Sequence, residues 1–411
     1  MPMEQTAFRV YRYRWVVLLV YFLLNALMQV QWITFAPITS EAVAFYGVPA
    51  IQIDLLSLIF MIVYIFVSLP ASYIIDTWGI RIGIGIGIGA VLMGVFGFMK
   101  GVCGSSYALV AVAQVGIAVG QPFVLNSVTK VGVRWFPLRE RATQAGISVL
   151  AQFVGIILAM ALTPPLFKTY GMETLLMIYG VVTLAGAVIF LLFNRERPAT
   201  PPCPQGHDER IAVLAGLKHI FRQRDMIYLL LVFFIALGIF NAVTTWIEQI
   251  VRPRGFDITQ AGVTGALMMS GGILGAAILP YFSDRLQKRK IFIVVTMILA
   301  IPGLAGLAFA GSYGLLLASS LAFGFFLMAS GPIAYQYSAE ICYPAPEATS
   351  QGLLLLAGQI SGIVFVIGMD VLAAGSDSKT SAMIVFLVLM ALNVFLTARL
   401  RESTLVKSGG I

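Results

Sequence analysis

Long apolar stretches recur along this chain, and shorter polar segments separate them. Each stretch holds about 20 mainly apolar residues, the length at which an α-helix crosses a bilayer. The pattern predicts an all-α membrane protein with twelve transmembrane helices. The predicted ranges are 13–40, 52–74, 80–99, 106–132, 143–166, 173–194, 227–250, 259–282, 291–310, 314–339, 349–372 and 380–399.

A Pro-rich, charged segment interrupts this pattern after the sixth predicted span. We expect residues 1–194 to form an N-terminal six-helix bundle, residues 195–226 a cytoplasmic linker, and residues 227–411 a C-terminal six-helix bundle. The halves repeat each other, since Gln152 and Gln359 recur at an offset of 207 residues. A parallel repeat of this kind predicts two bundles related by a pseudo-two-fold axis.

Composition supports a membrane protein without catalytic or metal chemistry. Hydrophobic residues make up 59% of the chain and charged residues only 11%, whereas soluble domains have about 45–50% and 25%. Three distant cysteines (Cys103, Cys203 and Cys342) and two histidines (His207 and His219) have neither disulfide nor metal-site spacing. We therefore expect no cofactor, no metal and no catalytic residues, and a membrane enzyme is disfavoured.

The distribution of basic residues predicts the orientation in the membrane. Twenty-one of the 26 Lys and Arg residues fall on one side of the predicted spans, and the other five are Lys100, Lys168, Arg252, Arg254 and Lys379. The positive-inside rule then puts both termini in the cytoplasm of a multi-pass cell-membrane protein. The net charge of +8 fits attraction to anionic lipid. We expect the lipid bilayer as a partner, and no nucleic acid.

The connections after the second and eighth spans carry related polar motifs. One reads DTWGIR from Asp76 to Arg81, and the other begins DR at Asp284 and Arg285. Both resemble the loop signature of major facilitator transporters, in which an acid meets a basic residue and a helix end and latches one conformation. The resemblance implies the major facilitator fold and a latch formed by Asp76, Arg81, Asp284 and Arg285. The alternative is two ordinary basic turns.

A closer resemblance rests on five short strings spread along nearly the whole chain. They are QWI at 31–33, FYGV at 45–48, IDLLS at 53–57, NAVTTWIEQ at 241–249 and AEICYP at 339–344. Together they resemble the feline leukaemia virus subgroup C receptor-related family. Members of that family carry choline and ethanolamine, haem export has been proposed for some, and a relative is linked to pyridoxine.

The same resemblance implies a solute site inside the membrane. The cavity tryptophan of the family matches Trp32, and its two glutamines match Gln152 and Gln359. Its cage tyrosine falls on Asn241, a departure that removes one of two rings facing a cation. A glutamate of the family falls on Gln336, between two tyrosines. The complete candidate set is Trp32, Gln121, Gln152, Asn241, Tyr335, Gln336 and Gln359.

The residues themselves give partial support to this site. Gln152 and Gln359 lie at equivalent depths of the two repeats, and polar residues within the bilayer tend to face a bundle interior or a watery path. The alternative for either glutamine is a hydrogen bond between helices. For Trp32 the alternative is a place in the interfacial aromatic belt.

The acids bear on coupling to an ion gradient. None lies clearly at a membrane midplane, and Asp54, about one turn inside the second span, is the candidate coupling residue. Its alternative role is a charge stabilised by the helix N-terminus. We expect a monomeric alternating-access secondary transporter, a facilitator or weakly coupled carrier. Its small polar solute is first of all an amine or quaternary amine such as choline or ethanolamine. The alternatives are a proton- or cation-coupled carrier of a vitamin-like or organic-acid solute, and a membrane sensor that does not transport.

Overall fold

The computed structural model describes residues 10–77, 82–137, 140–195, 198, 200, 219–286, 288–342, 347–373 and 379–402. Its described helices comprise the long ones that the apolar pattern predicts and some of only five to eight residues. They are α1 (Arg14–Ile33), α2 (Thr39–Tyr46), α3 (Ala50–Thr77), α4 (Ile82–Val102), α5 (Tyr107–Leu125), α6 (Val128–Trp135), α7 (Arg141–Phe193), α9 (Arg224–Thr245), α10 (Ile247–Val251), α11 (Ile258–Leu286), α12 (Lys290–Phe309), α13 (Tyr313–Cys342), α14 (Glu347–Ala373) and α15 (Thr380–Ala398), with 3₁₀ turns η1 (Ala36–Ile38) and η3 (Arg252–Arg254).

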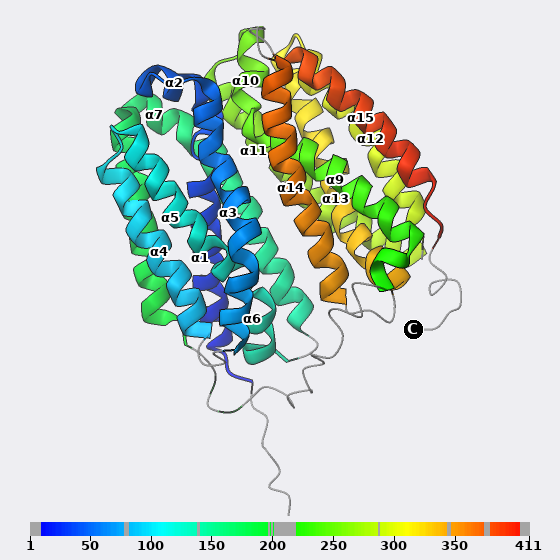
Figure 1. Cartoon of the computed structure of the whole chain (residues 1–411), viewed down its shortest axis with the longest axis horizontal. Helices are drawn as coiled ribbons and strands as arrows, with labels where there is room; N and C mark the ends of the chain where they lie inside the picture. The colour runs from blue at the N-terminus through cyan, green and yellow to red at the C-terminus, as the bar shows by residue number, and fades with distance from the viewer. Residues whose placement is uncertain are drawn as a thin grey trace, which may run out of the picture. The chain divides into compact units, whose positions relative to one another are not determined.

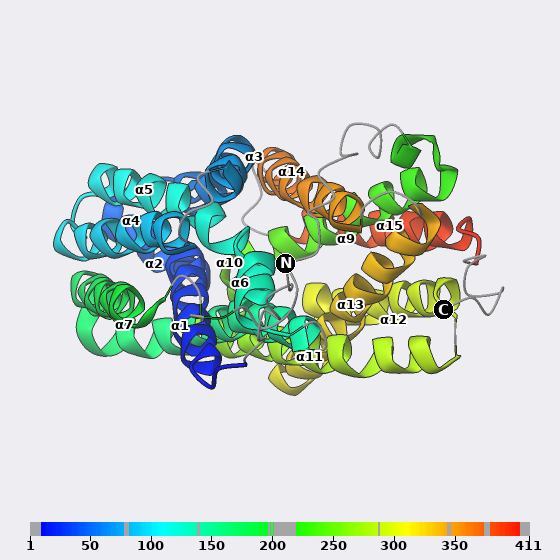
Figure 2. The ribbon, with the colours of Figure 1, turned by 90° about the horizontal axis from the view of Figure 1, so that it is seen from below.

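The chain forms two compact units. The first comprises residues 1–34, 62–159 and 166–208, and the second comprises 35–61, 160–165 and 209–411. In the first unit α4 and α5 lie side by side in both views of the ribbon (Figures 1 and 2). In the second unit α13 packs against both α11 and α12, and α14 packs against α9. The division into two bundles at residues 195–226 stays a prediction.

Every predicted span overlaps a helix of the structure. Ten described helical segments are long and apolar enough to cross a membrane, and Gly87–Val102 is a shorter apolar one. One of the ten, Thr143–Phe193, runs across a break at Gly171, whose φ of 78° is a backbone conformation that favours glycine. This break falls between the predicted spans 143–166 and 173–194. The count of twelve spans stays a prediction.

Small residues set how closely α4 and α5 approach each other. A Cβ atom added at Gly89 would lie 2.8 Å from the carbonyl oxygen of Gly120, and one added at Gly120 would lie 2.9 Å from the carbonyl oxygen of Gly89. Only glycine leaves room for backbones at this separation. Close packing of this kind replaces the hydrophobic drive that is lost between helices in lipid.

The first predicted span is divided near its end. Proline lacks an N–H, and its ring clashes with the carbonyl four residues earlier, which for Pro37 is that of Ile33. Accordingly α1 ends at Ile33, and the chain continues through η1 and α2 to Gly47, whose φ of 65° closes α2. The boundary between the two units falls at the same place, between Thr34 and Phe35.

Candidate functional site

Three of the predicted solute-site residues lie in the first unit. Trp32 occupies the last turn of α1 and Gln121 the end of α5; both are buried, and Gln152 on α7 is half-buried. The helices α1 and α7 meet where Gly155 packs against the carbonyl of Ala26. Gln152 precedes this crossing by three residues and Trp32 follows it by six. At 1.5 Å per residue their levels differ by about 13 Å along the helix axes, so one small solute touches both only if the two side chains reach toward each other.

In the second unit Asn241 lies against the backbone of α14 directly before Gln359. The Asn241 side-chain amide donates a hydrogen bond to the carbonyl oxygen of Gly358 at 3.3 Å, directly before Gln359. The next turn of α14 carries Gly362, where an added Cβ would lie 2.9 Å from the Asn241 Nδ2 atom. Asn241 therefore also joins α9 to α14, and both side chains are half-buried.

The remaining two candidates, Tyr335 and Gln336, are on α13 and lie elsewhere in that unit. The Tyr335 ring packs against Phe233, with centroids 5.4 Å apart, and Phe233 precedes Asn241 by about 12 Å along α9. Gln336 is exposed and donates from Nε2 to a carboxylate oxygen of Glu340 at 3.2 Å. The structure thus groups Gln336 with a charged cluster and not with Asn241 and Gln359.

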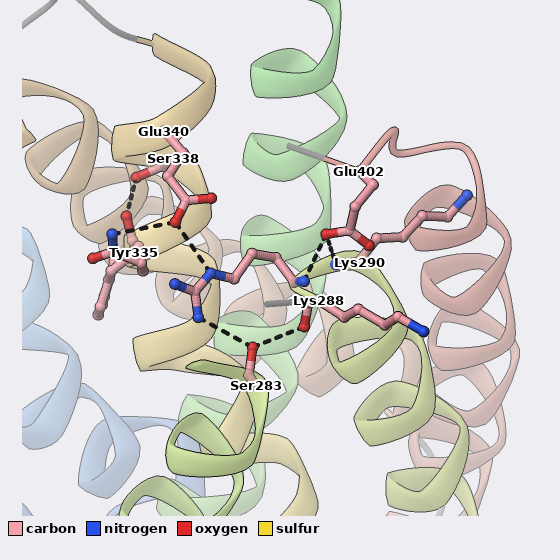
Figure 3. Close-up of polar contacts among 9 residues, drawn as sticks. Ser283, Lys288, Lys290, Tyr335, Ser338, Glu340 and Glu402 are labelled. Atoms are coloured by element: carbon pink, nitrogen blue, oxygen red, sulfur yellow. Dashed lines mark hydrogen bonds and ion pairs between the residues drawn. The ribbon is translucent and has the colours of Figure 1, made fainter. Parts of the chain in front are cut away.

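That cluster connects α13 to the loop motif that begins at Asp284 (Figure 3). Arg289 donates from Nε to Glu340 at 3.1 Å, and both side chains are at most 10% exposed. The guanidinium also bonds the hydroxyl of Ser283 at 3.3 Å, and that hydroxyl donates to the carbonyl of Lys288 at 2.9 Å. Ser283 lies on α11 and Glu340 on α13, and Arg289 of the loop bonds both. Arg289 therefore links α11 and α13.

The chain's C-terminal segment adds a carboxylate to this cluster. The backbone N–H groups of Arg289 and Lys290 donate to Glu402 at 2.6 and 3.2 Å. The carboxylate thereby satisfies N–H groups that have no acceptor within α12 and complements the positive end of its dipole. Nearby, the hydroxyl of Tyr337 donates to the carbonyl of Arg401 at 2.6 Å. The contacts hold residues 401–402 against the same loop.

Arg289 was not among the residues predicted for the latch. Arg285, which was, is exposed, whereas Arg289 is buried and paired. The signal was present, because Arg289 follows Arg81 by the same 208 residues that separate Asp284 from Asp76. Arg81 and the side chains of Asp76 and Asp284 lie outside the described residues, and all four residues, Arg285 included, stay predicted latch residues.

Asp54 bonds side chains where α9 ends, whereas its position in the sequence suggested a charge at the N-terminus of its own helix. Its side chain is buried, and its carboxylate accepts hydrogen bonds from the indole N–H of Trp246 at 3.1 Å and from Gln249 Nε2 at 2.8 and 3.0 Å. Trp246 and Gln249 lie where α9 passes into α10. The carboxylate therefore joins the second predicted span to the end of the seventh.

An ionic group in the same unit makes a parallel connection. Glu248, fully buried, accepts bonds from the backbone N–H and hydroxyl of Ser40 at 3.1 and 3.0 Å, and Arg252 pairs with Glu248 and Glu41 at 3.0 Å each. Burial alone would lower the pKa of Arg252, but the bonds and charges of Glu248 and Glu41 together outweigh it and raise that pKa. We call these contacts, with Asp54, Trp246 and Gln249, the outer junction, after the side of the membrane on which the predicted orientation places them.

Comparison with known proteins identifies the family. Residues 17–366 match the profile of the Major Facilitator Superfamily. This chain belongs to that superfamily. Solute carrier family 49 member A3 of Danio rerio is 30% identical over 393 residues, which cover 91% of this chain and 81% of that protein. Choline/ethanolamine transporter FLVCR1 of Felis catus is 27% identical over 422 residues, 98% of this chain and 74% of that protein.

A solved structure agrees on the fold. The bacterial homologue of the human lysosomal transporter Spinster, in an inward-facing and unoccupied conformation, matches with a TM-score of 0.73 and 15% identity, covering 95% of this chain and 97% of that one. The chain is thus an all-helical major facilitator transporter, a multi-pass membrane protein and not an enzyme. The predicted resemblance to the feline leukaemia virus subgroup C receptor-related family is confirmed.

Proposed function

We propose that this major facilitator transporter carries a small amine or quaternary amine, with choline and ethanolamine as the first solutes to test. The observation that carries the proposal is the match to choline/ethanolamine transporters over almost the whole chain. Transport proceeds by alternating access as a facilitator or weakly coupled carrier. The transporter acts as a monomer in the cell membrane, with both termini in the cytoplasm.

The proposed site divides its work between an aromatic face and neutral hydrogen-bonding groups. Trp32 provides the face, which attracts an organic cation by about 0.5–2 kcal/mol. Gln152 and Gln359 bond the polar end of the solute without adding a fixed charge. Choline and ethanolamine each have a cationic end for the ring and a hydroxyl end for the amides.

Asn241 is the position where the solute preference is decided in this proposal. An amide in place of the second ring weakens a cage for trimethylammonium, which has no N–H to donate. A primary ammonium group instead has three N–H donors that amide oxygens accept. Ethanolamine is therefore expected to bind at least as well as choline.

Two groups of contacts serve the conformational cycle in this proposal. The outer junction holds residues 35–61 to the end of α9, and its buried hydrogen bonds have to break when those segments separate. The Arg289–Glu340 cluster, together with the predicted latch residues, acts at the other end of the helices. Alternating access requires contacts of this kind to form and break in turn.

The second candidate function is proton- or cation-coupled transport of a vitamin-like or organic-acid solute. The buried carboxylate of Asp54 favours it, because ionisable groups within the membrane often serve proton relays. In that case protonation of Asp54 would weaken its role as acceptor for Trp246 and Gln249.

Flux measurement in proteoliposomes tests both candidates. Purified protein should mediate downhill uptake and exchange of radiolabelled ethanolamine or choline, above protein-free liposomes. Binding of the same solutes is measured separately by calorimetry. If neither amine is bound or carried, the amine assignment fails. Binding without flux of any solute would instead indicate a sensor.

A further inference from the structure

A buried lysine in the first unit is not accounted for by the functions above. Lys100 lies near the end of α4 and is only 1% exposed, although the sequence placed it among the charges outside the membrane. Lysine is almost never fully buried unless polar groups surround its ammonium. Here Nζ donates to the Gln31 carbonyl oxygen at 3.2 Å, to Gln31 Oε1 at 3.1 Å and to Thr34 Oγ1 at 3.3 Å.

Gln31 is the centre of this arrangement. Its side-chain N–H₂ donates to the hydroxyl of Thr183 at 2.8 Å and to the carbonyl of Tyr179 at 3.3 Å. Its carbonyl oxygen accepts a second bond, at 3.0 Å, from Gln114 Nε2. Four helices, α1, α4, α5 and α7, therefore meet at one residue, and both ends of its amide are fixed.

The position of Gln31 on α1 gives these bonds their effect. The helix ends at Ile33, so the carbonyls of its last turn lack donors from the helix itself. Lys100 and Gln114 supply donors to one of them, the carbonyl of Gln31. Lys100 thereby anchors the end of α1 directly before the boundary between the two units.

Trp32 lies between the two residues that Lys100 bonds. It follows Gln31, about 100° around the helix, and it precedes Thr34 by two residues. The bonds on either side fix both the rotation and the end of this last turn. We propose that Lys100 is a positioning residue for the solute, which acts by holding Gln31 and Thr34 so that the Trp32 ring keeps one orientation. This inference rests on the proposed role of Trp32 in the solute site.

Lys100→Met is the variant that separates this role from simple space filling. Methionine has a similar length and fills the same volume without donors. The Gln31 carbonyl keeps its bond from Gln114, and the Thr34 hydroxyl keeps its bond to the carbonyl of Val30 at 2.6 Å. Gln31 Oε1, the third acceptor named above, loses the one bond described for it. The matched control is Lys168→Met, which removes an exposed lysine of the same unit.

The first readout needs no solute. Protein labelled with 5-fluorotryptophan gives ¹⁹F resonances for its five tryptophans, and Trp32→Phe assigns that of Trp32. Lys100→Met should shift or broaden the Trp32 resonance and leave that of Trp135 in place, while Lys168→Met changes neither. An unchanged Trp32 resonance in folded Lys100→Met would overturn the proposal.

The second readout is a double-mutant cycle of choline or ethanolamine binding by calorimetry. Lys100→Met should raise the Kd about tenfold with Trp32 present and less than about twofold in the Trp32→Ala background, because residues that act through each other are not additive. Equal losses in both backgrounds would make Lys100 an independent structural residue and overturn the proposal. If neither amine binds wild type, the amine assignment fails, and the ¹⁹F measurement still decides the role of Lys100.

Thr34→Val keeps the proposal testable if Lys100→Met does not fold. This variant removes one of the three acceptors and retains Gln31 and its partners. The Trp32 resonance should move in Thr34→Val by less than in Lys100→Met. If Lys100→Met is unfolded and Thr34→Val leaves the Trp32 resonance in place, Lys100 has a structural role only.

Discussion

The Asp54 carboxylate accepts the indole N–H of Trp246 at 3.1 Å, although the two residues are 192 positions apart in the chain. Gln249 donates to both oxygens of the same carboxylate. The contact joins the beginning of α3 to the end of α9, and the bond between Ser40 and Glu248 joins neighbouring segments. A carboxylate with three such bonds is fixed in place.

Asp54→Asn tests whether this carboxylate couples transport to protons. An amide oxygen at the Oδ2 position still accepts from Trp246, and the new N–H₂ at the Oδ1 position donates to Gln249 once the Gln249 amide turns its oxygen toward it. Downhill exchange should therefore persist in the variant, and wild-type uptake should persist when a protonophore collapses the proton gradient. Radiolabelled exchange and uptake in proteoliposomes measure both. Complete loss of exchange in Asp54→Asn, together with pH-dependent accumulation by wild type, would instead support the coupled carrier.

Arg289→Gln should impair transport far more than Lys288→Gln. Removal of Arg289 leaves the buried Glu340 carboxylate without its opposite charge, and breaking a buried pair typically costs about 3–5 kcal/mol. The Lys288 side chain is exposed in the same loop and serves as the matched control. Uptake in proteoliposomes and the thermal midpoint of purified protein report the two effects. Equal uptake by both variants would mean that the Arg289–Glu340 pair is not part of the latch.

Gln152→Ala and Gln359→Ala should each weaken solute binding. The loss of one hydrogen bond to a polar group costs about 0.5–1.5 kcal/mol, which corresponds to roughly three- to tenfold in Kd. Trp32→Ala should weaken binding more, and Trp32→Phe should retain part of it if a ring face is what the solute meets. Calorimetry with the solute identified by flux measures the series. The proposed site is wrong if both glutamine variants bind as wild type does.

Asn241→Tyr restores the ring that the family's site has and this chain lacks. The variant should strengthen choline binding relative to ethanolamine, because a second aromatic face adds about 0.5–2 kcal/mol of attraction for a desolvated quaternary ammonium. Asn241→Leu is the control, since it also loses the bond to the Gly358 carbonyl but adds no ring. Calorimetric Kd values for both amines, compared between the two variants, give the result. Equal choline affinities would contradict a cation cage at this position.

The sequence by itself determined the class, the helices and the repeat. Apolar stretches of bilayer length form helices whatever they pack against, because backbone groups in lipid must bond within the segment. The same information put Gln152 and Gln359 at equivalent positions of the two repeats, and the 208-residue offset also pointed to Arg289. These are properties that spacing along one chain encodes.

Only the tertiary structure decided which polar side chains meet. Helices that are apolar on all sides carry little periodic signal to say which face is buried, so Lys100 was assigned to the outside and is instead bonded to Gln31. Likewise Gln336 proved to join Glu340, and Asp54 to join Trp246. A buried polar group needs a partner, but its identity depends on how helices far apart in sequence pack together.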